Sequence, residues 1–188
     1  MPLRAQNPVL ICVDLQLGFL EDSHWGDNRN NRNAEAICGQ IIDEWRRTDM
    51  KLIHVRHSST DPQSPLHNSA PGFAFNPLCA PIDGERVLTK SVNSCFIGTD
   101  LKAILDAANC RTVVIIGLTT DHCVSTTTRM AGNYGYDTFL VSDATATFDK
   151  TGIDGEVYDA ALVHATALAS LKDEFATIIT AEVLLASL

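Results

Sequence analysis

Short apolar runs recur along the chain and predict the strands of a buried sheet. The clearest are residues 9–13 and 113–116, because neither contains a polar residue and the second is entirely β-branched. Unbroken runs of this kind are typical of strands that are covered on both faces, as in a parallel sheet. Four further strands are expected at residues 51–56, 86–90, 137–141 and 175–180.

Helical spacing separates most of these runs. Residues 34–48 carry apolar side chains at positions 37, 41, 42 and 45, which places Trp45 on the inner face of a helix. Further helices are expected after Asp100, near Cys123, over residues 155–172 and at the C-terminal end. The alternation predicts a three-layer α/β/α fold with a doubly wound, mainly parallel sheet of six strands. Because no linker or repeat interrupts the pattern, residues 1–188 are expected to form one domain.

A long segment without regular periodicity lies between the second and third predicted strands in the chain. Residues 57–85 contain five prolines together with Gly72 and Gly84, and they predict an ordered loop. Loops of this length in a compact domain are usually functional, so we expect this one to roof a binding site.

Composition and charge narrow the class of protein. The net charge of −9 and the absence of a basic run argue against a nucleic-acid-binding protein. No apolar run is long enough to span a membrane, and the N-terminus lacks the apolar core of a signal peptide, so we expect a cytoplasmic protein. The six cysteines contain no Cys-x-x-Cys pair, which favours reduced thiols over a zinc site or a thioredoxin motif.

Cys123 is the candidate nucleophile. It follows the apolar run 113–116 and Gly117, at which the backbone is expected to change direction. Thr119, Thr120 and Asp121 are N-cap candidates, so a helix is expected to begin within one or two residues of Cys123. The helix dipole would then favour the thiolate, and nearby N–H groups would hold an oxyanion. The alternative is a structural cysteine, because buried cysteines often serve as small hydrophobic residues.

Two charged residues stand at the ends of other predicted strands. Asp14 follows residues 9–13, and Lys90 ends residues 86–90. Alone, each would be an ordinary solvated strand end, but parallel sheets bind ligands beyond the carboxyl ends of their strands. Asp14 can serve as the base and acid for Cys123, while the Lys90 ammonium stabilises the thiolate. Such a triad requires no histidine, and we expect His122 to point away from Cys123.

These residues belong to a set of motifs that resembles the isochorismatase-like cysteine hydrolases, which include nicotinamidase and N-carbamoylsarcosine amidohydrolase. The resemblance covers residues 9 to about 180. The matching motifs are Val13-Asp14-Leu-Gln16-Leu-Gly-Phe19, Gly84-Glu-Arg-Val-Leu-Thr-Lys90, Phe96-Ile-Gly98-Thr99-Asp100-Leu101, Gly117-Leu-Thr-Thr-Asp-His-Cys123-Val124, Gly135-Tyr136 and Ser142-Asp143-Ala144.

The resemblance implies roles for individual residues. It makes Asp14 the general base and acid, Lys90 its electrostatic partner and Cys123 the nucleophile. It also implies a cis peptide between Leu118 and Thr119, which would direct the Thr119 N–H to join the N–H of Cys123 as an oxyanion hole. The implied strand order is 3-2-1-4-5-6, and the implied assembly is a homo-oligomer, either a dimer, a tetramer or a larger one, whose subunits help to close the site.

The chain departs from the nicotinamidases in its potential metal ligands. Nicotinamidases carry an Asp-x-His pair and a further histidine after the second strand. The corresponding segment here contains His54, His57 and His67 but no Asp-x-His pair. A metal ion usually requires such a carboxylate–imidazole set, so we expect neither a metal nor another cofactor, and His54 is interpreted as a strand residue.

The leading hypothesis is hydrolysis of a small amide or carbamoyl C–N bond through a thioester acyl-enzyme. One alternative is an isochorismatase-type vinyl-ether hydrolase, which would not need Cys123. Others are a nucleotide-binding module, for which no glycine-rich phosphate motif is present, and a non-catalytic small-molecule-binding or interaction protein. Residues expected to lie near the substrate are Gln16, Phe19, His24, Trp25, Phe96 and His122. The identity of the substrate does not follow from the sequence, because it depends on the shape of the pocket.

Overall fold

The protein contains the predicted six-stranded sheet, in the order β3-β2-β1-β4-β5-β8. The computed structural model describes residues 3–188, so the first two residues of the predicted domain lie outside the described residues. The strands are β1 Val9–Val13, β2 Leu52–His57, β3 Arg86–Lys90, β4 Thr112–Leu118, β5 Asp137–Ala146 and β8 Thr177–Ile179. All five pairings between them are parallel. Because β8 is the sixth strand of this sheet, the order confirms 3-2-1-4-5-6.

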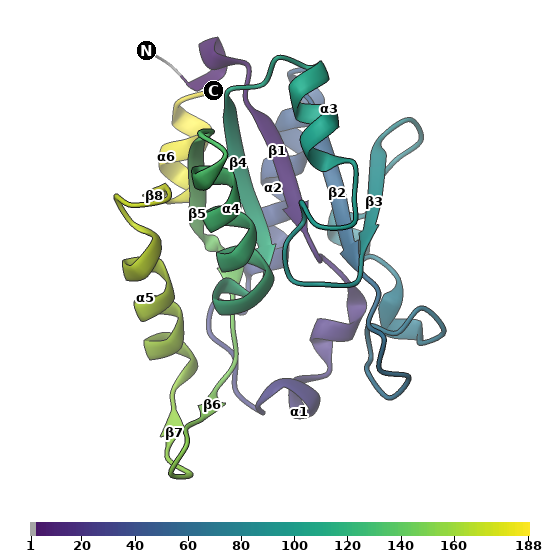
Figure 1. The fold of residues 1–188 in the computed structure, drawn as a ribbon, viewed down its shortest axis with the longest axis vertical. Coiled ribbons are helices and arrows are strands. Elements are labelled where there is room, and N and C mark those ends of the chain that lie inside the picture. Colours follow the sequence, from purple (N-terminus) through teal and green to yellow (C-terminus); the bar gives the residue numbers. More distant parts are fainter. Residues whose placement is uncertain (1–2) are drawn as a thin grey trace.

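Helices cover both faces of the sheet (Figure 1). One face packs against α2 Ala34–Arg47 and α6 Ala181–Ala186, and the other against α3 Leu101–Ala107, α4 Ser125–Asn133 and α5 Ala160–Leu171. Alternate residues of β1 enter the two cores: Leu10 faces the first and Ile11 the second. Both faces of β1 are buried, which explains why its sequence is apolar without alternation.

Shorter elements complete the chain. They are the 3-10 turns η1 Leu3–Gln6, η2 Leu17–Leu20, η3 Pro71–Phe73 and η4 Pro77–Cys79, the helix α1 Asp22–Trp25, the π-helical turn η5 Thr120–Val124, and the hairpin strands β6 Lys150–Thr151 and β7 Val157–Tyr158. None of the helices within residues 3–188 is long and apolar enough to cross a membrane.

Two boundaries differ from the sequence prediction by about five residues. β5 continues to Ala146, through residues that were expected to begin a loop, because it pairs with the end of β4 beyond a register irregularity. The helix expected at residues 155–172 begins only at Ala160, because β7 precedes it and the Asp159 carboxylate accepts a hydrogen bond from the Ala161 N–H at 2.8 Å. This cap determines the start of α5.

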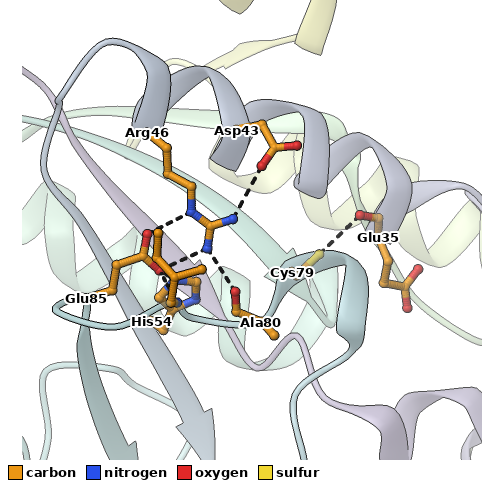
Figure 2. Close-up of polar contacts among 8 residues, drawn as sticks. Glu35, Asp43, Arg46, His54, Cys79, Ala80 and Glu85 are labelled. Carbon is orange, nitrogen blue, oxygen red and sulfur yellow. Dashed lines mark hydrogen bonds and ion pairs between the residues drawn. The ribbon is translucent and has the colours of Figure 1, made fainter.

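The long segment 57–85 is held against α2 and β2 by a partly buried ionic cluster (Figure 2). The guanidinium of Arg46 donates to Glu85 at 2.7 and 2.9 Å and to the Ala80 carbonyl at 2.8 Å. His54 Nε2 lies 2.9 Å from Glu85, which agrees with its interpretation as a strand residue. Burial raises the pKa of Glu85, but hydrogen bonds from Arg46, the Ile82 N–H and His54 lower it to about 2. The cluster therefore keeps an ionised carboxylate at the end of this loop.

Candidate active site

The site begins where β1 and β4 pair closely at their carboxyl ends. Gly117 lies opposite Val13, with φ of 121°, and a Cβ at this position would overlap the Val13 carbonyl oxygen. Gly117 was expected to end the strand, but β4 continues to Leu118. Glycine is required here for two reasons: its φ of 121° is rare for other residues and accompanies a register irregularity of β4, and a Cβ would block the close approach of the two backbones. This close pairing places Asp14, which follows Val13, next to the segment that follows β4.

That segment carries the candidate nucleophile. The Leu118–Thr119 peptide is cis, as the family resemblance implied. Cys123 lies in the π-helical turn Thr120–Val124, and α4 begins after it at Ser125. The helical segment therefore starts at Thr120, slightly earlier than expected. π-helical turns occur often at functional sites.

Two of the three expected N-cap side chains have hydrogen-bond partners elsewhere, and the third has none among the described residues. Thr119 occupies the N-cap position, but its hydroxyl is buried and has no hydrogen-bond partner among residues 3–188. Thr120 Oγ1 lies 3.0 Å from Thr145 Oγ1 and 2.9 Å from His164 Nδ1, and Asp121 accepts a hydrogen bond from Thr147. The turn is thus fixed by side chains of β5, α5 and the segment after β5, which sequence reasoning did not identify.

Asp14, Lys90 and Cys123 meet in the interior of the protein. Lys90 Nζ donates to Asp14 Oδ2 at 2.6 Å and to Cys123 Sγ at 3.2 Å. The three residues are 0%, 2% and 8% exposed. They arrive from the ends of β1 and β3 and from the turn after β4. The strand-end rule therefore identified three residues that form one cluster in space.

His57 is a fourth member of the cluster, which the sequence analysis did not place in the site. It is the last residue of β2, between β1 and β3, and its Nδ1 lies 3.1 Å from Lys90 Nζ. Its position at the carboxyl end of a strand was the signal that could have revealed it. In the sequence alone, His57 stands in a segment with His54 and His67 and therefore resembles a metal ligand more than a partner of Lys90.

Electrostatics correct one expectation about the nucleophile. Burial and the Asp14 carboxylate raise the pKa of the Cys123 thiol well above its usual range, although Lys90 lowers it. The resting group is therefore a thiol and not the thiolate that a helix dipole alone would favour. Burial opposes the charged form of Lys90, but the Asp14 carboxylate is the largest of the influences that raise the pKa of Lys90 above its usual value. An ammonium thus lies between a carboxylate and a thiol.

A proton acceptor is available beside this thiol. Asp14 Oδ1 is buried and has no hydrogen-bond partner among the described residues, while Oδ2 accepts from Lys90. A carboxylate oxygen of Asp14 lies within 4.8 Å of Cys123 Sγ. A buried carboxylate oxygen without a donor is unfavourable unless a proton reaches it. The arrangement therefore suits transfer of the Cys123 proton to Asp14.

Three residues of this cluster have side chains that can also bind metal ions. Asp14, His57 and Cys123 offer three ligand atoms within 4.8 Å of one another. However, Lys90 Nζ forms hydrogen bonds with all three, so an ammonium occupies the position that a metal cation would require. His54 contacts Glu85, and the His67 ring lies 2.8 Å from Ser69 Oγ. These residues therefore do not fit the metal ion of the nicotinamidases.

The predicted pocket residues lie in different environments. Gln16 is fully buried and hydrogen-bonds to the backbone of His57 and Phe73. Phe96 is buried in the same apolar cluster as Cys123. His122 is exposed and lies 3.4 Å from Asp121.

Phe19, Trp25 and His24 form an aromatic group on the other side of the sheet from Phe96. The rings of Phe19 and Trp25 stack at 4.8 Å, and His24 meets the edge of Trp25 at 4.7 Å. Phe19 and Trp25 belong to the core that α2 covers. Contact between substrate and any of the six predicted pocket residues stays a prediction.

Comparison with known proteins places this site in a family. The family model for the isochorismatase domain matches residues 8–183. An uncharacterised isochorismatase family protein of Bacillus subtilis, YrdC, is 47% identical over 180 residues, which cover 96% of this chain and 95% of the relative. Nicotinamidase 3 of Arabidopsis thaliana is 30% identical over 171 residues, or 82% of this chain and 78% of the relative. A crystal structure from Chromobacterium violaceum, described as a hydrolase of the isochorismatase family, has a TM-score of 0.94 and 38% identity, covering 100% of this chain and 96% of that one.

Proposed function

The chain belongs to the isochorismatase family of hydrolases, and on that premise we propose that it hydrolyses the C–N bond of a small amide or carbamoyl compound. The observation that carries this proposal is the Lys90 ammonium between Asp14 and the Cys123 thiol. A buried thiol beside a carboxylate with a free oxygen is suited to covalent catalysis. Cleavage of a vinyl ether needs no thiol at this position, so the arrangement favours the C–N bond.

The proposed reaction passes through two steps. Asp14 takes the Cys123 proton as sulfur attacks the substrate carbonyl, and the oxyanion binds the backbone N–H groups of Thr119 and Cys123. Collapse breaks the C–N bond, and Asp14 returns the proton to the leaving amine or ammonia. Asp14 then takes a proton from water, whose oxygen attacks the thioester; C–O replaces C–S, and the thiol is restored. Lys90 balances the negative charge throughout.

A relative named nicotinamidase supports amide chemistry, although the potential metal ligands here differ. We expect release of ammonia from at least one member of a panel of nicotinamide, N-carbamoyl amino acids, ureas and aliphatic amides. Ammonia would be measured for the wild type and for Cys123→Ala in parallel. Release by the wild type alone supports the proposal and identifies the substrate class. Equal release by both proteins would contradict a cysteine mechanism.

The proposed partner besides the substrate is a second copy of the chain, at the outer face of α5. Residues 160–171 contain no Asp, Glu, Lys or Arg, and Leu162 is 51% exposed. On the preceding hairpin, Val157 is also exposed. Two copies that each carry a net charge of −9 repel one another, and a symmetric interface places the same patch against itself. An uncharged apolar helix adds no charge repulsion and can pack against its own copy. We therefore propose a homo-oligomer, and we propose that it is cytoplasmic.

Light scattering after size exclusion tests this interface. We expect the wild type to be oligomeric and Leu162→Glu to be monomeric, because each symmetric contact would bury two added carboxylates. Val183→Glu is the matched control, since Val183 is 55% exposed on α6, away from α5. A monomeric wild type, or an unchanged oligomer in Leu162→Glu, would rule out α5 as the interface.

A further inference from the structure

We propose that His57 is a positioning residue whose neutral imidazole fixes the Lys90 ammonium between Asp14 and Cys123. An ammonium has three N–H donors. Those of Lys90 have three acceptors in the structure: Asp14 Oδ2 at 2.6 Å, His57 Nδ1 at 3.1 Å and Cys123 Sγ at 3.2 Å. Because the third acceptor is His57, it completes the coordination of the charge on which the proposed function rests.

The backbone of His57 is itself held in place from the segment that follows β1. Gln16 Oε1 accepts from the His57 N–H at 2.7 Å, and Gln16 Nε2 donates to the His57 carbonyl at 3.0 Å and to the Phe73 carbonyl at 3.1 Å. Gln16 is fully buried and lies two residues after Asp14. Gln16 thus holds the backbone of His57, and the ring of the same residue contacts Lys90. This assigns Gln16 a supporting role in addition to its predicted place near the substrate.

The protonation state of His57 decides whether it can act in this way. Three ionisable groups face it: Lys90 from β3, Asp14 after β1 and Cys123 from the π-helical turn. Burial and Lys90 lower the pKa of His57, and Asp14 opposes this only in part. The neutral ring therefore persists below the ordinary value of about 6.5. Once protonated, Nδ1 becomes a donor facing an ammonium, so activity is lost as the pH falls through this lowered pKa.

Two substitutions separate the role of His57 as a hydrogen-bond acceptor from the effect of its protonation. His57→Asn keeps an acceptor oxygen near the position of Nδ1 but does not titrate, whereas His57→Leu removes the acceptor. We expect His57→Leu to lower kcat about 100-fold with little change in KM, because the catalytic charge is misplaced. His57→Asn should retain kcat within about fivefold of the wild type. Its pH–activity profile should lose the acidic limb, which is the decline in activity at low pH that protonation of His57 causes. Wild-type kcat in His57→Leu, or an unchanged acidic limb in His57→Asn, would overturn the assignment.

A second measurement requires no substrate and is therefore independent of the proposed function. Alkylation of Cys123 by iodoacetamide, followed by peptide mapping, reports how well Lys90 stabilises the thiolate. The rate should fall about tenfold in His57→Leu and remain near that of the wild type in His57→Asn, with circular dichroism confirming that both fold. If no amide is hydrolysed but this difference appears, the role of His57 stands and the proposed function fails. Equal alkylation rates in all three proteins would contradict the positioning role.

Discussion

Cys123→Ala is expected to abolish hydrolysis and leave the fold intact. Loss of a catalytic nucleophile that acts as part of a unit typically lowers kcat by about 10⁴-fold or more. The substitution removes only a sulfur atom from a residue that is 8% exposed, so we expect the thermal transition to shift by a few degrees at most. Steady-state kinetics on the substrate identified by the amide panel, with differential scanning calorimetry, measure both effects.

The chain offers a matched control for this substitution. Cys110→Ala removes a half-buried thiol that donates to the Thr112 carbonyl, at the opposite end of β4 from the site. Its kcat should equal that of the wild type. Full activity in Cys123→Ala would instead make Cys123 a bystander. If that variant hydrolysed isochorismate, the vinyl-ether hypothesis would replace the present proposal. In that hypothesis Asp14 alone supplies the proton.

Lys90→Met is expected to impair both activity and stability. The Lys90 and Asp14 side chains are fully buried, and the substitution leaves the carboxylate without its charge partner. Removal of one member of a buried ion pair typically costs about 3–5 kcal/mol in the free energy of unfolding. Urea denaturation at pH 7 measures this cost.

A double-mutant cycle separates the ion pair from the chemistry. Asp14→Asn should lower kcat severely, because it removes the proposed base. Combining Asp14→Asn with Lys90→Met should recover part of the lost stability, since no unpaired charge remains, while activity stays absent. Strictly additive losses in stability would show that the two residues do not interact. Substantial turnover by Asp14→Asn would contradict its role as base.

The sheet could be predicted because burial on both faces leaves a record in the sequence. β1 and β4 are apolar at almost every position for that reason, and their ends were placed within one or two residues. The end of β5 was missed because Ser142 and Asp143 are polar. In the structure Ser142 donates to the Ile179 carbonyl, and Asp143 accepts from the Ala181 N–H. Both partners lie more than 30 residues away along the chain.

Sequence order alone determined much of the site. Asp14, Lys90 and Cys123 each end or follow a strand, and parallel strands bring their carboxyl ends to one edge, so their proximity follows from topology. The environment of these groups was decided only by the tertiary structure. Burial beside Asp14 keeps Cys123 a thiol, and His57 becomes the third acceptor of Lys90 only because β2 lies between β1 and β3. Hydrogen bonds and pKa values depend on neighbours in space, and those neighbours come from segments that are far apart in the sequence.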